Sequence, residues 1–145
     1  MVPTLLGRFH TRLVLMLFPA LAWTLLISLF LPGPAGQVYK ATLFTWFVVT
    51  LVGVVLWEPL YHGLMQFRWE KDWPAFFGLL NGVNEGILAY ILLRTVGPAV
   101  PDVGVGTFLI HFSTTWLVAW TVGNGPLRIV LPHWRFRGGN VLDTR

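Results

Sequence analysis

The stretch AFFGLLNGVNEGILAYILLRTVG, residues 75–97, is the clearest indication of the fold class of this chain. It is apolar along most of its length and is interrupted only by Asn81, Asn84 and Glu85 before the basic residue near its end. At about 1.5 Å per residue, a helix of this length crosses a hydrocarbon core of roughly 30 Å. Backbone polar groups in lipid must bond within their own segment, so the stretch predicts a transmembrane helix.

Three further apolar segments, at residues 13–31, 41–57 and 103–122, have similar lengths. The first is long for the apolar part of a signal peptide, so we expect an uncleaved helix there. The sequence therefore predicts an all-α, polytopic membrane protein. Its four transmembrane helices form one domain over residues 1–126, followed by a basic and aromatic cytoplasmic tail over residues 127–145.

The composition supports this class. Hydrophobic residues make up 55% of the chain and charged residues 11%, against about 25% charged in a typical soluble domain. The mean hydropathy is +0.68. The chain has no cysteine, which excludes disulfides, thiolate metal ligands and cysteine nucleophiles. The net charge of +4 is explained by cytoplasmic loops and anionic lipid headgroups, so we expect the lipid bilayer as partner and no nucleic acid.

The basic residues predict the orientation. If four helices alternate, eight basic residues fall on one side and only Lys40 and Arg94 fall on the other. The eight are Arg8, Arg12, Arg68, Lys71, Arg128, Arg135, Arg137 and Arg145. Because cytoplasmic loops carry the excess of Lys and Arg, we expect both termini in the cytoplasm of a plasma or inner membrane.

A short amphipathic helix is predicted between the second and third transmembrane helices. Pro59 disfavours helix at the residue before it and should bend or end the second helix at Glu58. One face of the segment that follows is apolar and the other is polar, as in a helix that lies on the cytoplasmic interface. The apolar face holds Leu60, Leu64 and Phe67, and the polar face holds Glu58, His62 and Gln66.

Gly78, Gly82 and Gly86 recur every four residues on the third helix. Small residues at this spacing allow another backbone to approach closely, so the third helix is predicted to be a central packing helix. Its partner could be any of the other three helices or another subunit.

Glu85 is the candidate functional residue. A carboxylate at the centre of a membrane is costly and should face protein or water. An ionisable residue at this depth therefore predicts a functional site. His111, at a similar depth in the fourth helix, is its candidate partner. We expect Asn81, Asn84, Thr114 and Thr115 to complete a polar cluster that either fixes the helix register or serves a proton relay or substrate.

The same residues are a poor metal site, because one carboxylate and one histidine are an incomplete set of ligands. We therefore expect no metal and no cofactor. Glu58 and His62 are spaced as metal ligands on one helix can be, but we expect them at the cytoplasmic interface, about half a membrane from Glu85.

Two aromatic and basic segments are predicted to lie at the membrane interface. Each could anchor the protein at headgroup depth or dock a partner. Their residues are Arg68, Trp69 and Trp73 before the third helix, and Trp134, Arg135 and Arg137 in the tail.

The sequence predicts the function less directly than it predicts the fold class. The catalytic and nucleotide-binding motifs of the common enzyme classes are missing from the sequence. The leading hypothesis is an accessory or structural subunit that packs against other membrane subunits or itself. One alternative is a membrane enzyme or binder of a lipid or isoprenoid that uses Glu85 and His111. The other is a proton-coupled carrier that acts as an oligomer. Whether the chain is an enzyme stays open.

Overall fold

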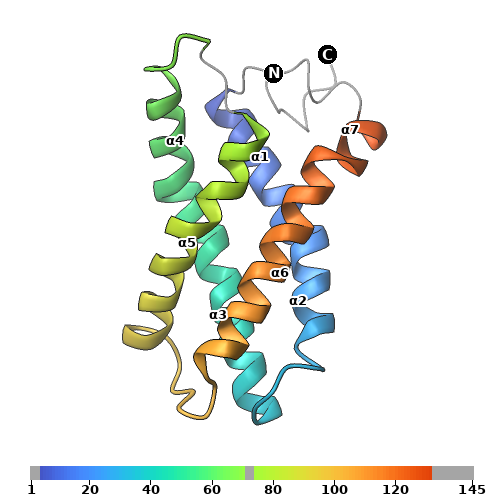
Figure 1. Ribbon diagram of the computed structural model, residues 1–145, viewed down its shortest axis with the longest axis vertical. Coiled ribbons are helices and arrows are strands. Elements are labelled where there is room, and N and C mark those ends of the chain that lie inside the picture. Colours follow the sequence, from blue (N-terminus) through green and yellow to red (C-terminus); the bar gives the residue numbers. More distant parts are fainter. Residues whose placement is uncertain (1–3, 71–73, 132–145) are drawn as a thin grey trace.

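The computed structural model describes residues 4–70 and 74–131, and these ranges are helices joined by short connections (Figure 1). Within these ranges, four helical stretches are long and apolar enough to cross a membrane: Leu5–Ile27, Ala35–Met65, Ala75–Thr95 and Val105–Val130. The predicted all-α class with four such helices is therefore confirmed. The stretches comprise α1 (Leu5–Leu15), η1 (Met16–Ala20) and α2 (Leu21–Ile27); α3 (Ala35–Val52), η2 (Gly53–Trp57) and α4 (Glu58–Met65); α5 (Ala75–Thr95); and α6 (Val105–Asn124) with α7 (Pro126–Val130).

The first two helices are longer than the sequence predicts. The first begins at Leu5, where the Thr4 hydroxyl caps it by accepting a hydrogen bond of 3.0 Å from the Gly7 amide. The sequence-based bounds were wrong because charged residues were read as flanks, whereas Arg8 and Glu58 lie inside helices and are buried.

Two prolines inside these helices are accommodated by wide π-helical turns. Pro19 lies within η1, and Pro59 is the second residue of α4, which directly follows η2. Proline removes one backbone hydrogen bond and its ring crowds the preceding turn, which a wider turn relieves. Of the two outcomes predicted for Pro59, a bend or an end of the second helix, the end is wrong, because α4 continues that helix without a loop and packs beside α1.

The predicted tail also begins with a helix. Gly125 ends α6, and Pro126 occupies the first turn of α7, where its missing N–H is not needed. The predicted tail over residues 127–145 therefore begins within a short helix. The rest of the tail lies outside the described residues.

The four helices alternate in direction and form one bundle (Figure 1). The start of α1, the end of α4, the start of α5 and α7 lie at one end of it. The first helix packs against the second and fourth, and α5 packs against α3 and α6. Buried apolar residues from all four helices form the core, among them Met16, Val48, Leu93 and Phe112.

The glycine stripe of α5 packs against aromatic rings of α6. A Cβ atom at Gly82 would lie 2.8 Å from the Trp116 ring, and one at Gly86 would lie 2.8 Å from the Phe112 ring. At Gly78 the nearest ring, that of Trp120, would be 3.7 Å away. The partner of the stripe is thus the fourth helix, and the predicted backbone approach is corrected: rings at the same four-residue spacing fill the room that the glycines leave.

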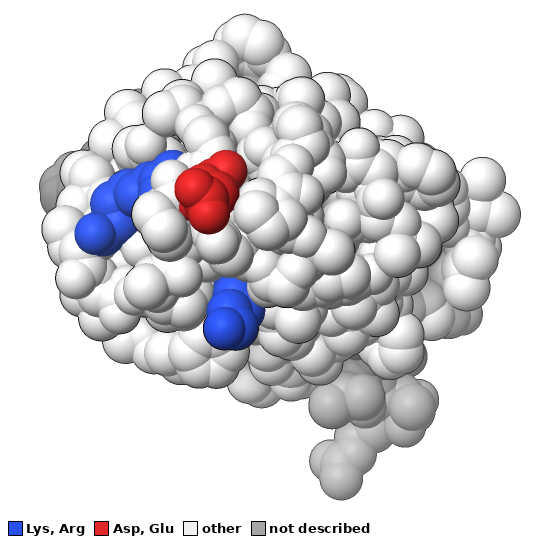
Figure 2. Space-filling model, turned by 90° about the horizontal axis from the view of Figure 1, so that it is seen from below, with Lys and Arg blue, Asp and Glu red and all other residues white. Residues whose placement is uncertain are grey.

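The opposite end of the bundle carries few charges. Figure 2 views this end and shows small isolated patches of charge on an otherwise uncharged surface. Its connections are held together by direct bonds, such as the Gln37 amide to the Asp102 carboxylate at 2.9 Å and the Thr107 hydroxyl to the Pro32 carbonyl at 2.8 Å.

Candidate functional site

Arg12 lies at the centre of a buried network of charges. Its Nε donates a hydrogen bond of 2.7 Å to Glu58, and its two terminal nitrogens donate bonds of 2.8 Å to the two oxygens of Glu85. The side chain of Glu85 is only 1% exposed. Paired bonds between a guanidinium and a carboxylate are both strong and directional. The first, second and third helices are therefore tied together through one arginine.

Arg8 completes the network one turn earlier on α1. Its Nη1 donates to the second oxygen of Glu58 at 3.2 Å, and its Nη2 donates to the sulfur of Met65 at 3.4 Å. We call Arg8, Arg12, Glu58 and Glu85 the charge quartet. Two guanidiniums and two carboxylates carry no net charge, which is the condition under which burying them is least unfavourable.

Gly53 provides the space for Arg12. A Cβ atom there would lie 2.4 Å from Nη1 and 2.5 Å from Cδ of the arginine, so only glycine fits while the guanidinium stays in place. The same guanidinium lies 3.4 Å from the carbonyl oxygen of Val49 and 5.9 Å from the centre of the Trp116 ring. The wide π-helical turn η2 also begins at Gly53, so the turn starts at the residue against which Arg12 packs.

Tyr61 and Asn84 extend the network. The Tyr61 hydroxyl donates to Glu85 at 2.9 Å and accepts a bond of 2.8 Å from the amide of Asn84. Glu85 thus receives three hydrogen bonds, two from Arg12 and one from Tyr61. Its oxygens are held in fixed positions and shielded from solvent.

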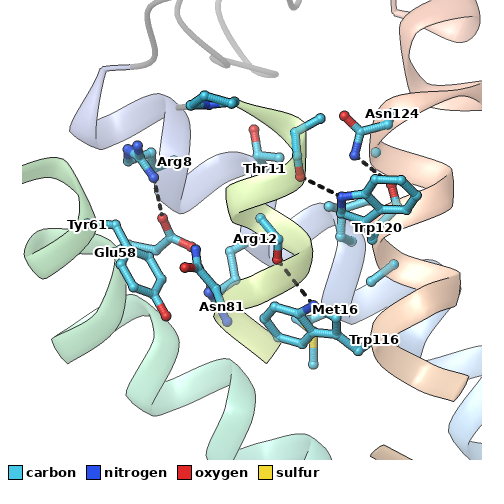
Figure 3. Close-up of a pocket in the computed structure, with 16 residues that line it drawn as sticks. Arg8, Thr11, Arg12, Met16, Glu58, Tyr61, Asn81, Trp116, Trp120 and Asn124 are labelled. Atoms are coloured by element: carbon cyan, nitrogen blue, oxygen red, sulfur yellow. Dashed lines mark hydrogen bonds and ion pairs between the residues drawn. The ribbon is translucent and has the colours of Figure 1, made fainter. Parts of the chain in front are cut away.

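A cavity of about 210 Å³ lies beside the quartet, between α1, α4, α5 and α6. One wall carries Arg8, Arg12, Glu58 and Asn81, whereas the indoles of Trp116 and Trp120 stand on the α6 side (Figure 3). The indole nitrogens are already engaged. They donate to the backbone carbonyls of Gly78 at 3.2 Å and Ala75 at 2.8 Å, so the rings offer the cavity mainly apolar surface. The cavity is therefore charged on one side and aromatic on the other.

His111 is not the hydrogen-bond partner of Glu85 that the sequence predicted. Its Nε2 is 3.0 Å from the Thr24 hydroxyl of the first helix, and the ring is 2% exposed. The partner predicted for Glu85 is thus corrected to Arg12 and Tyr61, because α6 turns His111 toward the first helix. Thr114 accepts a bond of 2.9 Å from the indole of Trp23, and the buried Thr115 hydroxyl has no partner among the described residues.

Glu58 was predicted to lie half a membrane away from Glu85, and this was wrong. One guanidinium bridges them, since Arg12 is long enough to reach both carboxylates. Sequence reasoning missed Arg8, Arg12 and Tyr61 as site residues. The available signal was the spacing of four between the two arginines, which places both on one face of the first helix.

Of the predicted interface residues, Arg68 lies over the Phe77 ring, with 4.9 Å between its guanidinium carbon and the ring centre. Trp69 is 99% exposed. Trp73, Trp134, Arg135 and Arg137 lie outside the described residues.

The geometry limits the chemistry. Glu85 is enclosed by Arg12 and Tyr61, so it is not placed to exchange protons with a molecule in the cavity. Glu58 and both arginines line the cavity, and they can hold a polar group there. Within residues 4–70 and 74–131, no group of three or more His, Asp or Glu side chains could hold a metal ion.

Comparisons with known proteins add no relative: no family model, no curated protein and no solved structure matches the chain.

Proposed function

We propose that this protein is an integral membrane protein that binds a small amphipathic, lipid-type molecule in the cavity beside the charge quartet. The observation that carries the proposal is the division of the cavity into a charged wall and an aromatic wall. Binding sites for small molecules are typically apolar with a few fixed polar groups that orient the ligand. Arg8, Arg12 and Glu58 of the quartet supply fixed polar groups, and Trp116 and Trp120 supply apolar surface.

The surface of the bundle supports a location in the bilayer. Large apolar side chains are exposed all along the helices, for example Phe18 at 67%, Phe47 at 52%, Val83 at 64% and Leu109 at 53%. A soluble protein rarely leaves so much contiguous apolar surface in water, whereas lipid tails solvate it. The uneven distribution of basic residues supports cytoplasmic termini, with α4 ending at the cytoplasmic interface.

The experiment is to identify the molecules that copurify with the full-length protein after gentle extraction, by native mass spectrometry and lipid analysis. Ala119 lines the cavity, so Ala119→Phe should fill part of it and remove the bound species. Ile110→Phe is the matched control, because Ile110 is 46% exposed on the same helix and is not among the cavity residues. Equal ligand content in the wild type and both variants would contradict binding in this cavity.

The accessory-subunit hypothesis is a second candidate, favoured by one observation. Phe67 and Trp69, just beyond the end of α4, are 88% and 99% exposed. Aromatic side chains are frequent anchors of protein interfaces. If they dock a partner subunit, Phe67→Ala with Trp69→Ala should shrink the native complex in mild detergent. An unchanged mass of the native complex would indicate that Phe67 and Trp69 anchor the protein in the membrane instead. A proton-coupled carrier is not favoured, because Glu85 is held by Arg12 and Tyr61.

A further inference from the structure

We propose that the ligand is an anionic amphiphile: its phosphate or carboxylate head lies in the cavity, and its single hydrocarbon chain lies in an apolar groove between α5 and α6. This inference rests on the proposed function and specifies the chemistry of the ligand.

The charges around the cavity favour an anionic head. Arg8, Arg12 and Glu58 line it, whereas Glu85 is not among its lining residues because it lies on the far side of Arg12. The wall facing the cavity therefore presents two guanidiniums and one carboxylate. The bond from Arg8 to Glu58, at 3.2 Å, is longer than the bonds of 2.7–2.8 Å that Arg12 makes to its carboxylates. Of the two cations, Arg8 thus lies farther from its carboxylate, and a guanidinium recognises phosphate and carboxylate heads with directed hydrogen bonds.

The cavity is too small to hold the hydrocarbon chain of the ligand as well as its head. At about 210 Å³ it is smaller than the roughly 300–1,000 Å³ of ordinary ligand pockets, so it holds a head group but not a long chain. A second hollow of about 570 Å³ runs between α5 and α6 on the outer face of the bundle. Its lining is almost entirely apolar and includes Val83, Ile87, Leu109 and Leu117.

Trp116 stands between the two spaces, because it lines both the cavity and the groove. The contact between α5 and α6 is tight at Gly82, where a Cβ atom would meet the Trp116 ring at 2.8 Å. One turn away, a Cβ atom at Gly78 would lie 3.7 Å from Trp120, which is an ordinary van der Waals contact. A chain in the groove therefore joins a head in the cavity only when the Trp120 ring rotates and gives up its bond of 2.8 Å to the Ala75 carbonyl.

The test titrates the purified full-length protein, in neutral-detergent micelles, with three single-chain lipids of equal chain length. Their heads are phosphate, phosphocholine and uncharged glycerol, and bound lipid is counted by native mass spectrometry. We expect the phosphate lipid to bind about tenfold more tightly than the other two, the factor that one added charge-assisted hydrogen bond provides. Arg8→Gln should abolish this preference, Arg8→Lys should retain much of it, and Arg128→Gln, at an exposed position on α7, should leave it unchanged.

Two further measurements test the chain and separate lipid from free anion. Val83→Trp should fill the groove and weaken binding of long-chain lipid, whereas Leu80→Trp, exposed on the same helix outside the groove, should not. Inorganic phosphate should not displace the lipid. Displacement at similar concentrations would identify a free anion as the ligand, and an unaffected Val83→Trp variant would overturn the groove. Equal binding of all three lipids would refute the anionic head but keep the proposed function, and binding of none would refute both.

Discussion

Replacing Arg12 by methionine tests whether the charge quartet holds the first three helices together. Arg12 donates bonds of 2.7 Å to Glu58 and 2.8 Å to each oxygen of Glu85, and its side chain is 8% exposed. Without it, two buried carboxylates face one guanidinium, that of Arg8. Removing one partner of a buried ion pair costs about 3–5 kcal/mol, because the other charge stays buried. We expect Arg12→Met to lower the free energy of unfolding by an amount in that range.

A double variant separates this charge effect from lost packing. Glu85→Gln alone leaves an excess positive charge, but Arg12→Met with Glu85→Gln leaves Arg8 and Glu58 as a neutral pair. The two substitutions should therefore cost less together than the sum of their separate costs, by about 2 kcal/mol. The assay is equilibrium unfolding in mixed micelles with increasing denaturing detergent, followed by tryptophan fluorescence.

The control is Arg128→Met, since Arg128 bonds Asn124 at 3.2 Å on the exposed surface. It should change the free energy of unfolding by no more than about 0.5 kcal/mol. The reasoning is refuted if Arg12→Met costs less than about 1 kcal/mol, or if the costs at Arg12 and Glu85 simply add.

Two other predictions concern packing and topology. Gly53→Ala should lower the free energy of unfolding by about 1–3 kcal/mol, because its methyl group would overlap Arg12. Gly63 has open space around it, so Gly63→Ala should be neutral or stabilising by up to about 1 kcal/mol in the same assay. Because the chain has no cysteine, single cysteines at the exposed Phe67 and Val96 report topology: an impermeant thiol reagent added outside intact cells should label Val96→Cys but not Phe67→Cys, and the reverse would invert the orientation.

The four long helices could be predicted because length and hydropathy alone identify them. The third helix, from Ala75 to Thr95, has nearly the predicted bounds, since its flanking Pro74 and Gly97 mark its ends clearly. The first two were placed too short. Charged residues near the end of an apolar segment are interpreted as flanking residues outside the helix. The sequence alone does not show that Arg12 and Glu58 neutralise each other inside the bundle.

The partners of Glu85 could not be predicted for a related reason. Nearly every face of these helices is apolar, so periodicity does not fix how each helix is rotated. Similar depth suggested His111, but rotation decides the contact, and it directs His111 to Thr24 instead. The glycine spacing did predict a packing face on α5. It could not show that aromatic rings rather than a backbone would fill that face.

In the membrane location proposed above, the charge quartet affects how the chain is inserted. A lone arginine or glutamate deep in a membrane helix costs about 2.5–3.5 kcal/mol on insertion scales, and the first three helices each bring such residues. They neutralise one another only when all three are present, whereas α6 contributes none of the four charges. We therefore expect the first three helices to enter the bilayer as one cooperative unit during biosynthesis. A chain stopped after Thr95 should remain protease-protected, whereas one stopped after Met65, which lacks Glu85, should not.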